Sequence, residues 1–303
     1  MNRGWFIAAL LVAPALAGCG GQAVTSGAGP VATPIPSPPA LSVLGYALES
    51  GGRSTPRVLS EYPQASTAPA HAFQELGGGM IRFDPSGTLW SDQIGSFAGY
   101  RPDGSSAGTM NVQEQLLSFD VRGLLYAVSC CTIDVFAVGS NNVAVLVRSI
   151  TPSFSGPCSA VADGAGNVYV SFCRAGPTGE QWSNVYEYGP SASGTATPIV
   201  TNPIATGPVT VDAGGNIYAP YNGAVGIWSA GTFGAGAPDR ALPIAPGNAV
   251  LDIAVDRAGN AYVLTRPVGS DLSLPRALLY FAAGTTTATT LQTGQLGSVA
   301  AVP

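Results

Sequence analysis

Short runs of alternating apolar and polar residues recur along the chain, and a repeated turn phrase separates the two runs of each pair. The phrase reads Asp, two residues, Gly, two residues and an aromatic residue, as in "DAGGNIY" (212–218) and "DRAGNAY" (256–262). Alternation with a period of two predicts a strand on either side of the turn. Each copy therefore predicts a β-hairpin, and the copies begin at Asp84, Asp120, Asp163, Asp212 and Asp256.

The residue types of the phrase suit a tight turn. An Asp carboxylate accepts hydrogen bonds from backbone N–H groups two residues further on, and Gly adopts a positive φ that a side chain with a Cβ resists. The aromatic residue is then placed to pack into the sheet. We expect the five aspartates to be structural.

A second phrase follows each hairpin, namely a strand that ends in an aromatic residue and then a turn of small residues. The chain ends supply one more repeat, because residues 42–59 match the second phrase and residues 296–303 match the first strand of a repeat. Five whole repeats and one shared repeat predict an all-β fold, a six-bladed β-propeller closed by N- and C-terminal strands that share one blade. A β-sandwich of many short strands is the alternative fold.

These repeats resemble NHL-type six-bladed propellers and their bacterial relatives, including streptogramin lyase and the gluconolactonase-like propellers. The resemblance covers about residues 41–303 and implies an architecture rather than an activity. It implies that binding sites lie on the face opposite the Asp turns. Streptogramin lyase and paraoxonase-like enzymes rely on histidines, whereas this chain has only His71, in a stretch that reads as a surface loop. We predict no catalytic residue.

The N-terminal residues predict export. One arginine precedes an apolar run over residues 5–17, which is too short for a permanent membrane span and typical of a signal peptide. Residues 16–19 read LAGC, which resembles the lipobox of bacterial lipoproteins, where the chain is cut before the cysteine and acyl chains such as palmitate are attached to it. An ordinary secretory signal with a chance cysteine is the alternative.

This resemblance divides the chain into three parts. We expect a lipoprotein signal peptide over residues 1–18, a lipid anchor on Cys19 with a disordered Gly/Pro/Ser-rich tether over 19–40, and the propeller over 41–303. By resemblance to Gram-negative lipoproteins, Gly at position 20 favours the outer membrane over the inner membrane.

The remaining cysteines are even in number, which favours disulfides in an exported protein. Cys158 and Cys173 stand almost symmetrically about the turn at Asp163 and are expected to form a bridge, worth about 3 kcal/mol. Cys130 and Cys131 are left to form a vicinal bridge, to stay reduced, or to link two blades through Cys130. Four buried thiols are the alternative.

Charge and composition exclude some partners and metals. Only 10% of residues are charged, the net charge is −5, and no Lys/Arg cluster suggests nucleic-acid binding. Calcium in gluconolactonase-like propellers is held by acidic residues near the axis, and here only Asp252 precedes an inner strand. Asp252 is therefore a weak metal candidate, and we expect no cofactor. Other acids outside the turns include Asp92, Glu114 and Asp134.

Two insertions carry a large share of the few charges. They cover residues 173–184 and 265–276, and the resemblance places both on the site-bearing face. Their candidates for partner binding are Arg174, Glu180, Trp182, Arg266, Asp271 and Arg276. Loops on a rigid scaffold often bind partners, although the insertions are also explained as tolerated surface length. We therefore predict a monomeric, non-catalytic envelope lipoprotein that binds a protein or glycan; a metal-dependent hydrolase or lyase acting on a small lactone or glycan is the alternative.

Overall fold

The computed structural model describes most of the chain beyond residue 42, and residues 38–303 form one compact unit. The described ranges are 43–47, 57–62, 71–75, 80–93, 95–101, 104–129, 131–153, 156–176, 179–234, 236–269, 274–294 and 296–301. The predicted signal peptide, Cys19 and tether lie outside these ranges. None of the described residues forms a helix long and apolar enough to cross a membrane.

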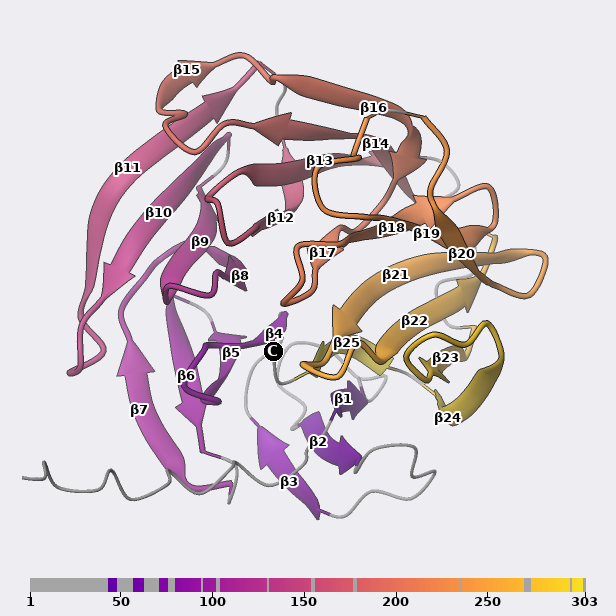
Figure 1. The fold of residues 1–303 in the computed structure, drawn as a ribbon. Coiled ribbons are helices and arrows are strands. Elements are labelled where there is room, and N and C mark those ends of the chain that lie inside the picture. The colour runs from indigo at the N-terminus through magenta and orange to yellow at the C-terminus, as the bar shows by residue number, and fades with distance from the viewer. Residues whose placement is uncertain are drawn as a thin grey trace, which may run out of the picture. The chain divides into compact units, whose positions relative to one another are not determined.

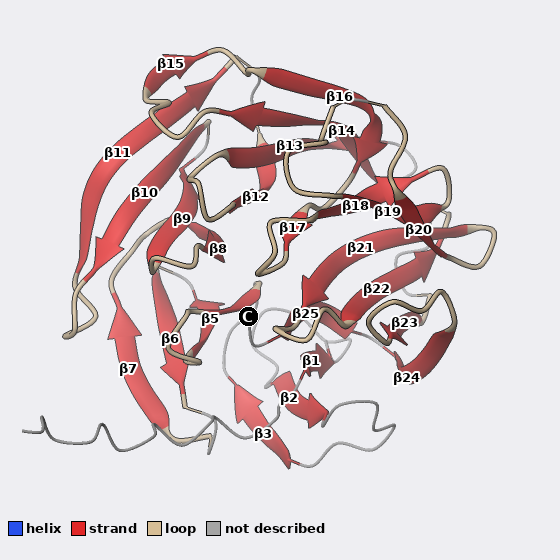
Figure 2. Ribbon diagram, viewed as in Figure 1, coloured by secondary structure: helices blue, strands red, loops and turns tan. Residues whose placement is uncertain are grey.

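The regular structure of the described residues consists entirely of strands, which form six sheets (Figures 1 and 2). The first sheet contains β4 (Ile81–Phe83), β5 (Leu89–Gln93), β6 (Ser96–Tyr100) and β7 (Ser106–Met110). The second contains β8 (Gln115–Phe119), β9 (Leu124–Ser129), β10 (Thr132–Val138) and β11 (Ala144–Pro152), with β15 (Gly194–Ala196) on its edge. The third contains β12 (Pro157–Ala162), β13 (Val168–Gly176), β14 (Gly179–Tyr188) and β16 (Val200–Thr206).

The remaining three sheets complete the unit. The fourth contains β17 (Thr210–Val211), β18 (Ile217–Tyr221), β19 (Ala224–Trp228) and β20 (Arg240–Pro243). The fifth contains β21 (Asn248–Val255), β22 (Ala261–Pro267), β23 (Arg276–Phe281) and β24 (Ala288–Gly294). The sixth joins the C-terminal β25 (Leu296–Ala301) to β1 (Val43–Ala47), β2 (Arg57–Tyr62) and β3 (His71–Glu75), whose side chains are not described.

The first strand of each sheet lies at a common centre (Figure 1). Strands β4, β8, β12, β17, β21 and β25 contact one another in that order, and β25 also contacts β4. Residues from all six of these strands line one small cavity of about 80 Å³. The predicted all-β propeller is therefore confirmed. The alternative β-sandwich is wrong, because a sandwich has two facing sheets rather than sheets around an axis.

The two ends of the propeller meet in one sheet, as the sequence predicts. Strand β25 pairs antiparallel with β1, with Leu44 opposite Ala300 and Gly45 opposite Val299. The prediction of a loop around His71 is wrong, because His71 begins β3 and pairs with Glu61 of β2. The Ala- and Pro-rich residues before His71 predict a loop, whereas the strand that begins at His71 is formed by pairing with β2.

Each Asp turn is held by its own carboxylate. In the turn at Asp212, Oδ1 accepts hydrogen bonds from the N–H groups of Gly214 and Asn216, each at 2.9 Å. Oδ2 accepts from the Asn216 amide at 2.8 Å and from the Tyr218 hydroxyl at 3.1 Å. Gly215 has φ of 80°, as the turn requires. Both carboxylate oxygens are thus used inside the turn, which confirms a structural role.

The aromatic residue of the phrase does more than fill the core. Its polar group donates to the second carboxylate oxygen in every copy, which the sequence did not predict. The other four bonds are Trp90 to Asp84 at 2.9 Å, Tyr126 to Asp120 at 3.4 Å, Tyr169 to Asp163 at 3.2 Å and Tyr262 to Asp256 at 3.3 Å. A buried hydroxyl or indole N–H needs a partner, so the Asp and the aromatic residue depend on each other.

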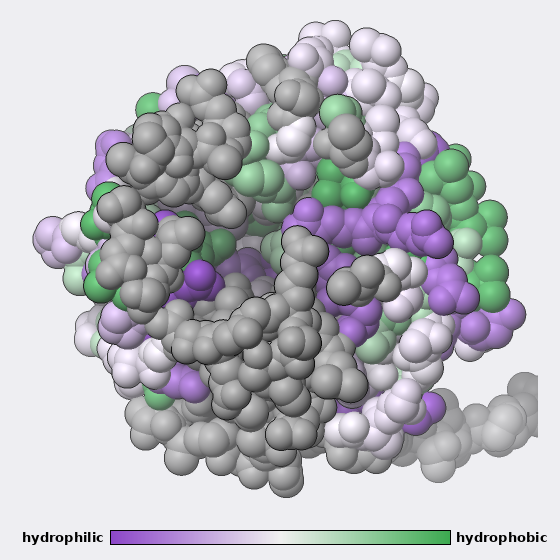
Figure 3. All heavy atoms as spheres, turned by 180° about the vertical axis from the view of Figure 1, so that it is seen from behind, coloured by the Kyte–Doolittle hydropathy of each residue, from purple (hydrophilic) through white to green (hydrophobic). Residues whose placement is uncertain are grey.

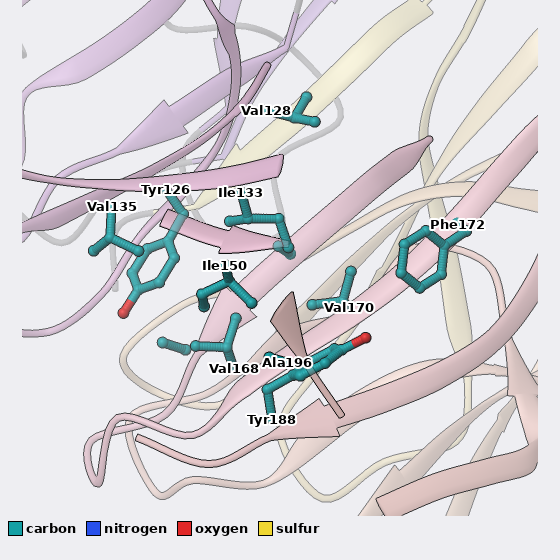
Figure 4. Packing of buried hydrophobic residues seen from close by; sticks show 12 residues of the cluster. Tyr126, Val128, Ile133, Val135, Ile150, Val168, Val170, Phe172, Tyr188 and Ala196 are labelled. Atoms are coloured by element: carbon teal, nitrogen blue, oxygen red, sulfur yellow. The ribbon is translucent and has the colours of Figure 1, made fainter. Parts of the chain in front are cut away.

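Neighbouring sheets bury their faces against each other. Between the second and third sheets, Tyr126, Ile133 and Ile150 pack on Val170 and Tyr188, and all five are fully buried (Figure 4). Similar apolar clusters lie between other pairs of sheets. Burial of apolar area in these wedges is the main favourable term that holds the ring together.

The predicted disulfide joins Cys158 to Cys173, with Cα atoms 5.6 Å apart, and is confirmed. It links the start of β12 to β13 across the hairpin at Asp163. Cys131 is exposed. Cys130 lies outside the described residues, so the alternatives for that pair stay open.

The turn at Asp163 offers a matched test of backbone conformation. Gly166 has φ of 91°, and an added Cβ would lie 3.2 Å from both Arg122 and Pro190. Gly164, in the same turn, has ordinary φ, and a Cβ there meets only Val121, at 4.0 Å. We expect Gly166→Ala to lower the free energy of unfolding by about 1–2 kcal/mol or more, and Gly164→Ala to change it by less than about 0.5 kcal/mol, in urea titrations. Equal effects would contradict the turn geometry.

Candidate functional site

The axis of the propeller is held by an ion pair. Arg82 of β4 contacts Asp252 of β21 through two N–O distances of 3.1 Å. Ser298 of β25 donates to the same carboxylate at 2.6 Å, and the N–H of Val299 donates to it at 3.1 Å. The network thus joins the last inner strand to both of its neighbours.

This network bears on the metal prediction for Asp252. Both oxygens of the carboxylate already accept hydrogen bonds, and a guanidinium neutralises its charge. Arg82 is also the one charged residue among those that line the axial cavity. Calcium requires several free oxygens with net negative charge. In the part of the chain that the structure describes, no three His, Cys, Asp or Glu residues are grouped to hold a metal. Asp252 is therefore better explained as a structural residue.

The axis opens into a wider hollow on the face of the Asp turns. The hollow has a volume of about 390 Å³, and its lining includes Phe83, Phe119, Val161 and Val211. Arg257 stands at its rim and is exposed. The turn carboxylates around it are occupied by their own turns, so they offer little chemistry to a ligand.

Three carboxyl groups lie at the opposite end of the first two sheets. Asp92 is near the end of β5, Glu114 directly precedes β8, and Asp134 is on β10, 9% exposed. Burial raises the pKa of Asp92 to about 6, and the N–H of Leu116 opposes part of the rise. Burial, together with the charge of Asp134 and a hydrogen bond to it, raises the pKa of Glu114 to about 7.

These acids were visible in the sequence but were not selected there as a site. Glu114 Oε2 and Asp134 Oδ1 are buried without a hydrogen-bond donor. With its pKa raised to about 7, Glu114 retains a proton near neutral pH and is able to act as a general acid. No local sequence pattern indicates this pair. Its formation depends on where the segment before β8 meets β10 in the folded sheet.

The two insertions form different structures in different sheets. Strands β13 and β14 extend as a hairpin as far as Gly176, which pairs with Gly179, and their register shifts once, between Ser171 and Cys173. The side chains of Arg174, Glu180 and Trp182 are not described. In the fifth sheet, Arg266 and Arg276 end β22 and begin β23, whereas Asp271 lies outside the described residues. Within the described chain the six candidates are thus not brought into one site.

The outer edge of the second sheet presents an apolar surface that the sequence analysis missed. Val143, Val145, Leu146 and Val147 are 52–60% exposed at the start of β11. Green spheres gather at the right edge of Figure 3, which is the side of β11 when the view of Figure 1 is turned by 180°. Strand β15 pairs with β11 only from Ile150 to Pro152, which leaves the earlier residues at an open edge. Such an edge favours addition of a partner strand.

The axial ion pair is testable by a double-mutant cycle. Arg82→Leu and Asp252→Asn each leave a buried polar group without its partner, so each is expected to lower the free energy of unfolding by about 3–5 kcal/mol. The double variant is expected to lose clearly less than the sum. Arg122→Leu is the control, because that arginine is 45% exposed and its ion pair with Asp120 should contribute about 1 kcal/mol or less. If the losses in the free energy of unfolding were additive, the two residues would not interact. If calcium raised the melting temperature of the wild type but not of Asp252→Asn, Asp252 would bind a metal.

The carboxyl pair predicts a pH dependence of stability. The pKa of Glu114 is raised from 4.5 to about 7 on folding, so between these values the folded state holds a proton that the unfolded state has released. The free energy of unfolding should therefore fall as pH rises from about 4.5 to about 7. We expect Glu114→Gln to flatten this fall in urea titrations at about pH 4 and about pH 8, which lie on either side of the interval.

Asp239→Asn is the control for this measurement. Hydrogen bonds from Ser229 lower the pKa of Asp239, so it titrates below the interval. An unchanged slope in Glu114→Gln would show that Glu114 does not hold a proton in this interval.

Comparison with known proteins shows the fold alone. No protein-family model and no curated protein match this chain. Among solved structures, a protein of unknown function from Bacteroides caccae is 10% identical, with 86% of this chain and 98% of that one covered at a TM-score of 0.56. A protein from Lactobacillus plantarum is 14% identical, with coverage of 84% and 82% and a TM-score of 0.50. A putative 6-phosphogluconolactonase from Bacteroides uniformis is 14% identical, with coverage of 84% and 83% and a TM-score of 0.48.

Proposed function

We propose that this chain is a non-catalytic binding or scaffolding lipoprotein of the cell envelope, which recognises a protein or glycan through the propeller face opposite the Asp turns. The observation that carries the proposal is the long hairpin of β13 and β14. It is paired from Val168 with Tyr188 at one end to Gly176 with Gly179 at the other. A paired two-stranded arm on a rigid scaffold presents residues at a defined position, as a binding element needs.

The axis supports the same reading. Catalysis at the centre of such a ring requires free carboxylates or a metal, and here Arg82, Ser298 and backbone N–H groups occupy the Asp252 carboxylate. The axial cavity of about 80 Å³ is also much smaller than the pockets of about 300 Å³ or more that hold small-molecule ligands.

The anchor and the ring complete the proposal. Cys19 is proposed to carry lipid, with residues 20–40 as a tether to a monomeric propeller at the outer membrane. We further infer that the sheet shared by both ends acts as a sixth blade, so that the ring has six blades. The support is the pairing of β25 with β1 and the contacts of β25 with β21 and β4.

A hydrolase acting on a small lactone or glycan is the second candidate. The buried acids Asp92 and Glu114 favour it, because their pKa values of about 6 and 7 suit a general acid near neutral pH. If this candidate is correct, the wild-type protein hydrolyses a lactone, Glu114→Gln abolishes that activity, and the control variant Asp239→Asn retains it. Without such activity the carboxyl pair is structural.

The binding proposal is tested by mild crosslinking of cells that produce the full chain. We expect a specific envelope protein to be recovered with the wild type and reduced at least about fivefold with Trp182→Ala, at an unchanged melting temperature, because the substitution removes an aromatic anchor from the arm. Arg257→Ala, on the turn face, is the matched control. Cys19→Ser should move the protein from the membrane to the soluble fraction. Equal recovery with Trp182→Ala would remove the arm from the proposal.

A further inference from the structure

A groove runs between the first and second sheets on the face of the Asp turns. It has a volume of about 500 Å³, and both sheets line it, the first with Arg101 and the second with Arg122. The amide of Asn142, in the turn between β10 and β11, donates to the carbonyl oxygen of Ala107 on β7 at 2.9 Å and so joins the two walls. The groove is therefore preformed, and its volume lies within the range of about 300–1,000 Å³ that is usual for ligand sites.

Arg122 is held in the groove by a buried carboxylate. In three other turns the second carboxylate oxygen accepts from an Asn amide four residues later, as in the bond from Asn216 to Asp212. The second sheet has Leu124 at that position, and Arg122 donates to Asp120 instead, through Nε at 2.9 Å and Nη2 at 2.6 Å. An amide would satisfy the turn, whereas a guanidinium adds a charge and further N–H donors. Its Nη1 forms no hydrogen bond with any described residue, and the side chain is 45% exposed.

Arg101 brings a second guanidinium to the groove from the end of β6. Its Nη1 donates within its own turn, which leaves Nε and Nη2 without an acceptor in the described part of the chain. Neither of the ion pairs that the described residues form includes Arg101. Asp84 also lines the groove, but both of its oxygens accept hydrogen bonds, from its own turn and from Trp90. The groove thus offers positive charge to a ligand.

The end of the groove nearest the axis is apolar. Phe119 is half-buried there, and Val121, two residues later, is 56% exposed. Hydroxyl groups of the lining come from Ser86, Thr88 and Ser140. Guanidiniums beside an apolar surface match a ligand that carries a carboxylate close to an apolar group. A peptide does so with neighbouring side chains, and its amides can bond to the hydroxyl groups, whereas an acidic sugar has no apolar side chain to place on Val121.

We propose that the groove binds an extended acidic peptide of a partner protein, with carboxylates on Arg101 and Arg122 and a bulky apolar side chain on Val121. The guanidinium fork matches a carboxylate through two parallel hydrogen bonds. This site goes beyond the proposed function, because it lies on the face of the Asp turns and includes no residue of the arm formed by β13 and β14. Either proposal can therefore fail without the other.

The experiment is isothermal titration calorimetry of the full chain with the peptide acetyl-Ser-Asp-Leu-Asp-Leu-Ser-amide, for which we expect saturable binding. A peptide with Asn in place of both Asp residues should bind at least about tenfold more weakly, because it lacks the charges. A peptide with Ser in place of both Leu residues should bind at least about threefold more weakly, because it lacks the apolar contact. No binding of the acidic peptide, or equal binding of the Asn peptide, would overturn the proposal. Trigalacturonate binding without peptide binding would assign the groove to a glycan instead.

Arginine variants separate binding from a structural role. Arg101→Gln should weaken binding of the acidic peptide at least about tenfold at an unchanged melting temperature, because the arginine is exposed. Arg122→Gln should act in the same way, since its amide can still donate to Asp120 as Asn does in other turns. Arg240→Gln is the matched control, because Arg240 is exposed on β20 and does not line the groove. Equal peptide affinities of Arg101→Gln and Arg240→Gln would contradict the assignment.

Two further variants locate the peptide. Val121→Ser should remove the preference for the Leu-containing peptide over its Ser counterpart, because Val121 is the exposed apolar residue of the lining. Trp182→Ala should leave peptide affinity unchanged, because the arm lies outside the groove. A retained preference in Val121→Ser, or a loss of peptide binding in Trp182→Ala, would show that the peptide binds elsewhere.

Discussion

Strand β25 has to lie between β21 and β4 for the propeller to close, and the contact of Asp252 with Arg82 and Ser298 holds it there. Asp252 is 4% exposed, and its carboxylate bonds to Arg82 of β4 and to Ser298 of β25. The clusters that pack between neighbouring sheets are apolar and therefore tolerate small shifts. The ion pair is directional, so it sets how the C-terminal strand is seated. Closure in turn lets each sheet bury both of its faces.

Hydrogen bonding within the fold also distinguishes the structural polar groups of this protein from those that could act on a ligand. The five turn aspartates recur most regularly among the acidic residues, yet the oxygens of each accept hydrogen bonds from its own turn and from an aromatic residue six positions later. Groups that could act on a ligand are instead those with a buried polar atom that has no hydrogen-bond partner, such as Glu114 Oε2 and Asp134 Oδ1. Both acids lie at strand ends away from the Asp turns.

The ends of the strands away from the turns thus carry the features that vary between sheets. The third sheet extends a hairpin, the fifth opposes two arginines, and the first two enclose acidic groups. A ring of repeated sheets tolerates such variation because each strand end can change without disturbing the apolar wedges between sheets. Binding of an envelope partner is compatible with this division.

The sequence by itself determined the hairpins, their turns and the Cys158–Cys173 bridge, because each of these depends on residues less than about one repeat apart. It also indicated that the two ends pair, since the missing halves of one repeat stand at residues 42–59 and 296–303. Only the tertiary structure decided that Asp252 meets Arg82, that Glu114 meets Asp134 and that β15 crosses to β11. These contacts join different sheets, or a strand with the loop before its sheet, and their partners follow from how neighbouring sheets pack rather than from any local pattern.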